Sequence, residues 1–179
     1  MIASVIERTN ARHRDRFRIC HFSVQSNHLH LIVEAADRDA LLSGMRGLGV
    51  SLARQINRLL GRKAPFIADR WHGRALETPR AARNVLVYVF ANFKKHDVPI
   101  TASGPVIDLF SSAPYFRGFL ELNGVAFIEK PGSRVPDWLV RLQCPVEPPR
   151  TWLLSRGWMR HGLISGHEAP RSPDRQCTR

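Results

Sequence analysis

Two histidines in an apolar stretch are the first residues of this sequence that could do chemistry together. His28 and His30 are separated by one residue within 28–35, whose composition is typical of a β-strand. Because side chains alternate faces along a strand, both imidazoles point the same way, about 7 Å apart along the strand. They can then converge on one metal ion, with Glu34 on the same face as a further ligand or supporting group. The alternative is a hydrogen-bonded pair of histidines on a half-buried sheet.

A polar stripe further along the chain carries a tyrosine. Polar side chains recur at spacings of four, four, four and three and form one face of an otherwise apolar helix over 79–96: Arg80, Asn84, Tyr88, Asn92 and Lys95. Asn92 offers a neutral oxygen of the kind that Mg²⁺ or Mn²⁺ binds. Arg80 and Lys95 are suited to contacts with phosphate. For Tyr88 the alternative is ordinary packing at the surface.

In combination these groups are suited to phosphoryl transfer. A metal ion on two histidines and one amide oxygen keeps positions open for phosphate oxygens and can stabilise developing charge. A tyrosine is neutral at pH 7, so it needs activation by the metal or a base as it attacks. The product would be a phosphotyrosine bond, which conserves the energy of the cleaved linkage. A strand with a free 3′-hydroxyl can then reverse the step without ATP.

Hydrophobic periodicity predicts the elements that must position these groups. The expected order is helix, strand, strand, helix, strand, helix, which is the split βαβ pattern with its first strand missing. In the first strand, Phe17, Ile19, His21 and Ser23 are expected on one side. Asp37 or Asp39 is expected to cap the long helix and Gly61 to end it. The predicted segments are a helix over 2–12, strands over 17–24 and 28–35, a helix to 61, extended or hairpin structure over 64–77, and a helix over 79–96.

Composition favours a polyanionic partner. The 179-residue chain carries a formal net charge of +12, which favours nucleic acid, although a genome rich in Arg codons would give a similar excess. Three cysteines without CxxC spacing argue against a disulfide scaffold or zinc ribbon and favour a reduced, cytoplasmic setting. We find neither a membrane-spanning run nor a signal peptide, so no membrane partner is expected.

Further basic and aromatic side chains could contact DNA. Trp71 and His72 could stack on unpaired bases, although Trp71 could equally lie in the core. Trp138, Trp152 and Trp158 are expected to be packing anchors of the C-terminal extension rather than platforms for bases. The basic residues expected to line a DNA track, or alternatively to form solvated surface, are Arg54, Arg58, Arg62, Lys63, Arg70 and Arg74.

Two motifs give a resemblance to a known family. The stretch Val24-Gln25-Ser26-Asn27-His28-Leu29-His30-Leu31-Ile32-Val33-Glu34 resembles the histidine–hydrophobic–histidine motif of the HUH single-tyrosine transposases. The segment from Val87 to His96 resembles their catalytic helix, and Asp69-Arg70-Trp71-His72 also looks like a family segment. The match is to REP-associated tyrosine transposases and IS200-like transposases, and it covers about residues 1–120.

The resemblance implies an α+β fold, a ferredoxin-like antiparallel sheet with helices packed on one face. It also implies that His28, His30 and Asn92 bind Mg²⁺ or Mn²⁺, and that Tyr88 is the nucleophile acting on single-stranded DNA with a hairpin. Family members begin with a strand that this sequence lacks, so unpaired backbone groups are expected in the sheet. A nucleoid-associated monomer or homodimer is expected. The expected regions are a catalytic domain, truncated at its N-terminus, over 1–120, an irregular C-terminal extension over 121–164 and a disordered basic tail over 165–179.

Three functions therefore remain open. The chain could be an active transposase, a non-catalytic hairpin-binding derivative of one, or a metal-dependent hydrolase that uses the histidines without Tyr88.

Overall fold

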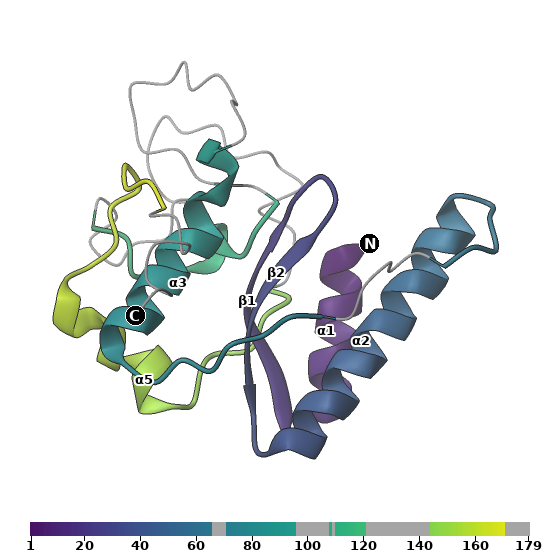
Figure 1. The fold of residues 1–179 in the computed structure, drawn as a ribbon, viewed down its shortest axis with the longest axis horizontal. Helices are drawn as coiled ribbons and strands as arrows, with labels where there is room; N and C mark the ends of the chain where they lie inside the picture. Colours follow the sequence, from purple (N-terminus) through teal and green to yellow (C-terminus); the bar gives the residue numbers. More distant parts are fainter. Residues whose placement is uncertain (66–70, 96–107, 109, 121–143, 171–179) are drawn as a thin grey trace, which may run out of the picture. The chain divides into compact units, whose positions relative to one another are not determined.

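The computed structural model describes residues 1–65, 71–95, 108, 110–120 and 144–170. They form a mixed α/β structure with a two-stranded antiparallel sheet and helices (Figure 1). Contacts divide the chain into two units that interleave along the sequence. One contains Met1–Cys20, Val33–Ala75 and Leu142–Arg150, and the other contains His21–Ile32, Leu76–Arg141 and Thr151–Arg179.

The sheet is a hairpin of β1 (Phe17–Val24) and β2 (Leu29–Ala35), as the sequence predicts. At the turn the backbone N–H of Gln25 donates to the carbonyl of His28 at 2.9 Å. At the open end the N–H of Ala36 donates to the carbonyl of Arg16 at 2.8 Å. The tight connection over 25–28 therefore fixes where the histidine motif begins.

The alternation predicted for β1 is wrong, because the strand carries an extra residue. The backbone groups of Ile19 bind Asn10 and Glu147, so they face away from β2, and those of Phe22 bind Ser112. In a regular strand, residues facing the same edge are an even number apart, but Ile19 and Phe22 are three apart. One additional residue between them, a β-bulge, reverses the alternation within the strand. His21 and Ser23 therefore do not share a face with Phe17 and Ile19.

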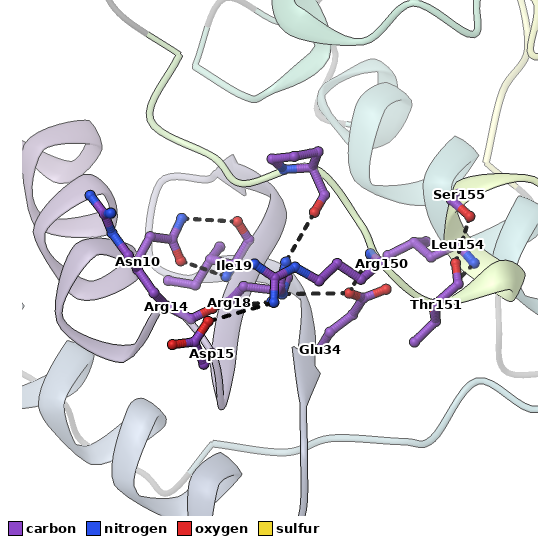
Figure 2. Close-up of polar contacts among 11 residues, drawn as sticks. Asn10, Arg14, Asp15, Arg18, Ile19, Glu34, Arg150, Thr151, Leu154 and Ser155 are labelled. Atoms are coloured by element: carbon purple, nitrogen blue, oxygen red, sulfur yellow. Dashed lines mark hydrogen bonds and ion pairs between the residues drawn. The ribbon is translucent and has the colours of Figure 1, made fainter.

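Several backbone groups of β1 that face away from β2 have partners, although the sequence predicts unpaired groups in this sheet. In the first unit, the Asn10 amide accepts from the N–H of Ile19 at 2.7 Å and donates to its carbonyl at 3.1 Å (Figure 2). In the second unit, the N–H of Val24 donates to the carbonyl of Phe110 at 2.8 Å, and Phe22 binds Ser112 through both backbone groups. Side chains and an irregular segment thus bind groups that a neighbouring strand would otherwise bind.

Two helices build the first unit. α1 (Ile2–His13) buries Val5 and Ile6 and contacts α2 (Arg38–Leu59). Asp37 caps α2, since its carboxylate accepts from the N–H of Ala40 at 2.7 Å. The predicted end is also confirmed, because Gly61 adopts a φ of 61° after the last turn. Hydrophobic periodicity predicts an apolar stripe in α2 made of Leu41, Met45, Leu48, Leu52, Ile56 and Leu59. The fully buried residues are Ala40, Gly44, Leu48 and Leu52, so the two sets agree at Leu48 and Leu52 and differ by one position before them.

α3 (Pro79–Ala91) is the main helix of the second unit and continues as the 3₁₀ helix η1 (Asn92–Lys95). Thr78 caps it, because its hydroxyl accepts from the N–H of Ala81 at 3.1 Å, and Pro79 occupies the first turn. The described part of 64–77 contains no strand, so the third strand of the expected element order is not found there. The remaining residues of that prediction, 66–70, lie outside the described residues.

Segments from the C-terminal part complete the second unit. α5 (Trp152–Ser155) is capped by the Thr151 hydroxyl (Figure 2), and the 3₁₀ helix η5 (Gly157–His161) packs on α3. Trp158 is 2% exposed and contacts Phe116, which confirms it as a packing anchor. Trp152 is 51% exposed, but its ring packs beside Gly157 and under the Arg160 guanidinium, which lies 4.9 Å from the ring centroid. Trp138 lies outside the described residues. Contacts continue to Glu168, beyond the point where the sequence predicts a disordered tail. Among the described helices none is both long and apolar enough to cross a membrane.

Candidate metal and nucleophile site

The two histidines of the motif converge at their ring tips. His28 is the last residue before β2, and His30 is the second residue of that strand. Their Nε2 atoms lie 2.9 Å apart, and the ring centroids are 4.5 Å apart at an interplanar angle of 82°. His28 is exposed and His30 is half-buried, so the pair lies at the surface of the second unit. The convergence predicted from strand alternation is therefore present in the structure.

The helix brings two more predicted residues to the same place. The amide nitrogen Nδ2 of Asn92 lies 3.2 Å from Nε2 of His30, and Asn92 is only 3% exposed. Tyr88, one turn earlier on α3, places its ring centroid 4.9 Å from that of His30, nearly perpendicular at 77°. His28, His30, Tyr88 and Asn92 all belong to the second unit. The helical spacing of four thus carries the phenol and the amide to the histidine pair.

The hydrogen-bonding roles within this cluster depend on the tautomers of the two histidines and on the orientation of the Asn92 amide. Nδ1 of His28 lies 2.6 Å from Oδ1 of Asn27, which can only accept, so Nδ1 is the donor of this contact. Nε2 of the same ring faces Nε2 of His30, and the Asn92 amide lies on the other side of that atom. Three polar groups from separate residues therefore meet at the tip of the His30 ring.

The donor set fits a metal ion. Two nitrogen ligands at the usual ~2.1 Å from a metal, about 90° apart, lie roughly 3.0 Å from each other, close to the separation of the two Nε2 atoms. Rotating the Asn92 amide by 180° exchanges its oxygen and nitrogen and turns an acceptor towards the histidines. Asn27 fixes the His28 ring from behind, as supporting groups do in metal sites. Among the described residues, no set of three or more His, Cys, Asp or Glu side chains could hold a metal, and the third polar side chain beside the two histidines is the Asn92 amide.

A buried carboxylate that sequence reasoning missed supports the turn before His28. The Ser23 hydroxyl donates to Asp108 at 2.9 Å, and the Gln25 side chain donates to Ser23 at 2.6 Å. The backbone of Gln25 in turn binds the carbonyl of His28. Burial raises the pKa of Asp108 above its usual value, although hydrogen bonds from Phe110 and Ser23 oppose the shift. No sequence signal connects Asp108 with Ser23, because the two are 85 residues apart.

His21 lies in the hydrophobic core and is not a candidate ligand. Its ring stands edge-on to Phe90 and Phe116, at centroid distances of 5.2 and 5.5 Å, and Nδ1 is 3.3 Å from the Ser112 hydroxyl. Burial lowers its pKa to about 3, so the ring is neutral at physiological pH.

Glu34, the further candidate ligand on the histidine strand, has other partners. A carboxylate oxygen of Glu34 accepts from the backbone N–H of Arg150 at 2.8 Å and lies 3.7 Å from the Arg18 guanidinium (Figure 2). Both partners belong to the first unit, as does Glu34. These contacts argue against Glu34 as a metal ligand.

The predicted DNA-contacting residues are spread over the chain. Arg80 is exposed on α3, two turns before Tyr88, whereas Arg54, Arg58 and Arg74 are exposed in the first unit. Arg70 and the side chain of Lys95 lie outside the described part of the chain. Trp71 is 44% exposed and so is not in the core, which is one of its two predicted alternatives.

Comparison with known proteins adds no relative. No protein-family model, no curated protein and no solved structure matches the chain.

Proposed function

We propose that this protein is a metal-dependent transposase that cleaves and rejoins single-stranded DNA carrying a hairpin, with Tyr88 as the nucleophile. The observation that supports the proposal is the meeting of four predicted side chains from two distant segments of the chain: His28, His30, Tyr88 and Asn92. The fold proposed with it is the ferredoxin-like α+β arrangement, of which the antiparallel hairpin and helices are the coarser part.

Each residue has a role in the proposed reaction. His28, His30 and Asn92 would hold Mg²⁺ or Mn²⁺, which when bound polarises a phosphate and stabilises the charge that develops on it. The Tyr88 oxygen attacks phosphorus and loses its proton, while the bond from phosphorus to the 3′ oxygen breaks and that oxygen gains a proton. The downstream strand remains on Tyr88 through its 5′ phosphate. A free 3′-hydroxyl reverses the same exchange and rejoins DNA.

The surroundings of Tyr88 are suited to holding the phenol in place. The perpendicular packing of its ring against His30 restricts its orientation, and the buried Asn92 one turn later anchors the end of α3. Arg80 lies on the same helical face and carries an exposed guanidinium that can neutralise an approaching backbone phosphate.

A covalent-adduct assay with the full chain tests the proposal. Single-stranded hairpin DNA labelled at its 3′ end is incubated with Mn²⁺, and the protein is separated under denaturing conditions. We expect a labelled adduct from the wild type and from Tyr115→Phe, the matched control that removes the other tyrosine of the chain. Tyr88→Phe, His30→Ala and addition of EDTA should abolish the adduct.

The same assay separates the alternative functions. Hairpin binding without cleavage in the wild type would identify a catalytically impaired or domesticated DNA-binding derivative of such a transposase. Metal-dependent cleavage that persists in Tyr88→Phe would identify a hydrolase that uses the histidines alone. Either outcome would overturn Tyr88 as the nucleophile.

A further inference from the structure

A hollow on the first unit is lined by polar and basic side chains. Its volume is about 210 Å³, and its lining residues are Arg8 from α1 and Ser51, Arg54, Gln55 and Arg58 from α2. The four α2 residues are three or four positions apart or adjacent, so they form one stripe on the helix surface. The packing of α1 against α2 brings Arg8 to this stripe. Three guanidinium groups therefore line one hollow.

These guanidinium groups have no carboxylate partner within the part of the chain that the structure describes. Arg16, Arg18 and Arg83 each bind a carboxylate, in pairs with Asp37, Glu34 and Glu168. Arg8, Arg54 and Arg58, by contrast, form no ion pair or hydrogen bond through their side chains among the described residues. The hollow is thus a place where the excess positive charge of the chain is not compensated.

Uncompensated cations at this spacing repel one another, and a bound anion removes that cost. Arg54 and Arg58 are four residues apart on one helix, a spacing at which like charges destabilise the helix. The planar fork of a guanidinium matches two oxygens of a phosphate, and Ser51 and Gln55 add neutral donors beside the cations. The lining is therefore chemically complementary to phosphate.

We propose that the hollow binds a backbone phosphate of nucleic acid, as a site built from residues other than the Tyr88 cluster. The net charge of +12 favours a polymer of phosphates over a single free anion. Contacts of this kind position a nucleic acid without reading its bases. The proposal requires that the chain binds nucleic acid, but it does not require cleavage by Tyr88.

Salt-dependent binding of the full chain to a fluorescein-labelled DNA hairpin tests the site. Anisotropy is measured with EDTA, which keeps cleavage out of the measurement, between about 50 and about 200 mM NaCl. The test variant is Arg54→Gln with Arg58→Gln. The control is Arg38→Gln with Arg46→Gln, which removes two exposed charges from α2 away from the hollow. Each phosphate that is no longer neutralised should lower the slope of log affinity against log salt by about 0.9.

The expected result is a shallower slope for the test variant and a slope near wild type for the control. Arg8→Gln, which leaves α2 unchanged, should show the same direction of change. Equal loss in both double variants would overturn the site in favour of general surface charge. Slopes that stay unchanged in the test variant would also overturn the site. So would a protein whose melting temperature is raised by inorganic phosphate while the variants bind DNA like the wild type. Tyr88→Phe should keep the wild-type slope whatever the adduct assay shows.

Discussion

The amide of Asn92 lies 3.2 Å from Nε2 of His30, although 62 positions separate the two residues in the chain. Asn92 is the first residue of η1, where the α-helical turn of α3 tightens, and its side chain is almost wholly buried. A buried amide needs a hydrogen-bond partner, and here the partner is a histidine that already faces a second histidine. The contact therefore holds the end of α3 to the histidine strand.

Replacing Asn92 should weaken metal binding. We expect Asn92→Ala to lower the affinity for Mn²⁺ by at least about tenfold, because even supporting groups in metal sites contribute that much. Asn92→Asp supplies a charged oxygen ligand at the same position and should bind Mn²⁺ at least as well as the wild type. Titration calorimetry with Mn²⁺ measures both. Asn84→Ala, an exposed asparagine two turns earlier on the same helix, is the control. Equal affinities for the two alanine variants would contradict a ligand role for Asn92.

Gly44 is required where α2 crosses Phe17. A Cβ atom built on Gly44 would lie 2.3 Å from the Phe17 ring, whereas one on Gly47 would lie 3.5 Å from the nearest atom, in His13. We expect Gly44→Ala to lower the free energy of unfolding by about 1–3 kcal/mol, since overpacking outweighs the gain in helix propensity. Gly47→Ala should instead raise it by about 0.5–1 kcal/mol. Urea unfolding measures both, and similar shifts in the two variants would refute this packing.

The sequence is sufficient for those features that local periodicity determines. Strand alternation predicts that His28 and His30 converge, and helical spacing predicts that Tyr88 and Asn92 share a face. The meeting of the two pairs depends on the family resemblance, because periodicity places residues on a face but does not say which faces meet. The hydrogen bonds of Asp108 with Ser23 and the ion pair of Arg83 with Glu168 join distant segments, and no local pattern reports them. The bulge in β1 escapes prediction because the alternation rule assumes a regular strand.

Arg83 should stabilise the second unit without contributing to DNA binding. Its guanidinium lies 2.6 and 3.0 Å from the Glu168 carboxylate and donates to the carbonyls of Gly162 and Leu163. Arg83→Gln should lower the free energy of unfolding by about 1–3 kcal/mol, because partly buried acceptors lose a charged donor. Arg80→Gln, an exposed arginine on the same helix, should weaken hairpin binding and leave stability near wild type. Thermal unfolding measures the stability of both variants, and anisotropy measures their affinity for the hairpin. If Arg80→Gln were destabilised and Arg83→Gln were not, the stabilising role of Arg83 would be contradicted.

Acid should destabilise the second unit through His21. The pKa of its ring is lowered by burial from 6.5 to about 3, so between these values the unfolded chain binds one more proton than the folded chain. The free energy of unfolding should therefore fall as the pH drops from about 6.5 towards 3, by at most about 1.4 kcal/mol per pH unit from this group. His21→Leu should remove that part of the slope, whereas His161→Leu, at an exposed position, should retain it. Urea unfolding across this pH range measures the slopes. A His21→Leu protein with the wild-type slope would mean that His21 is hydrated and protonated in the folded state.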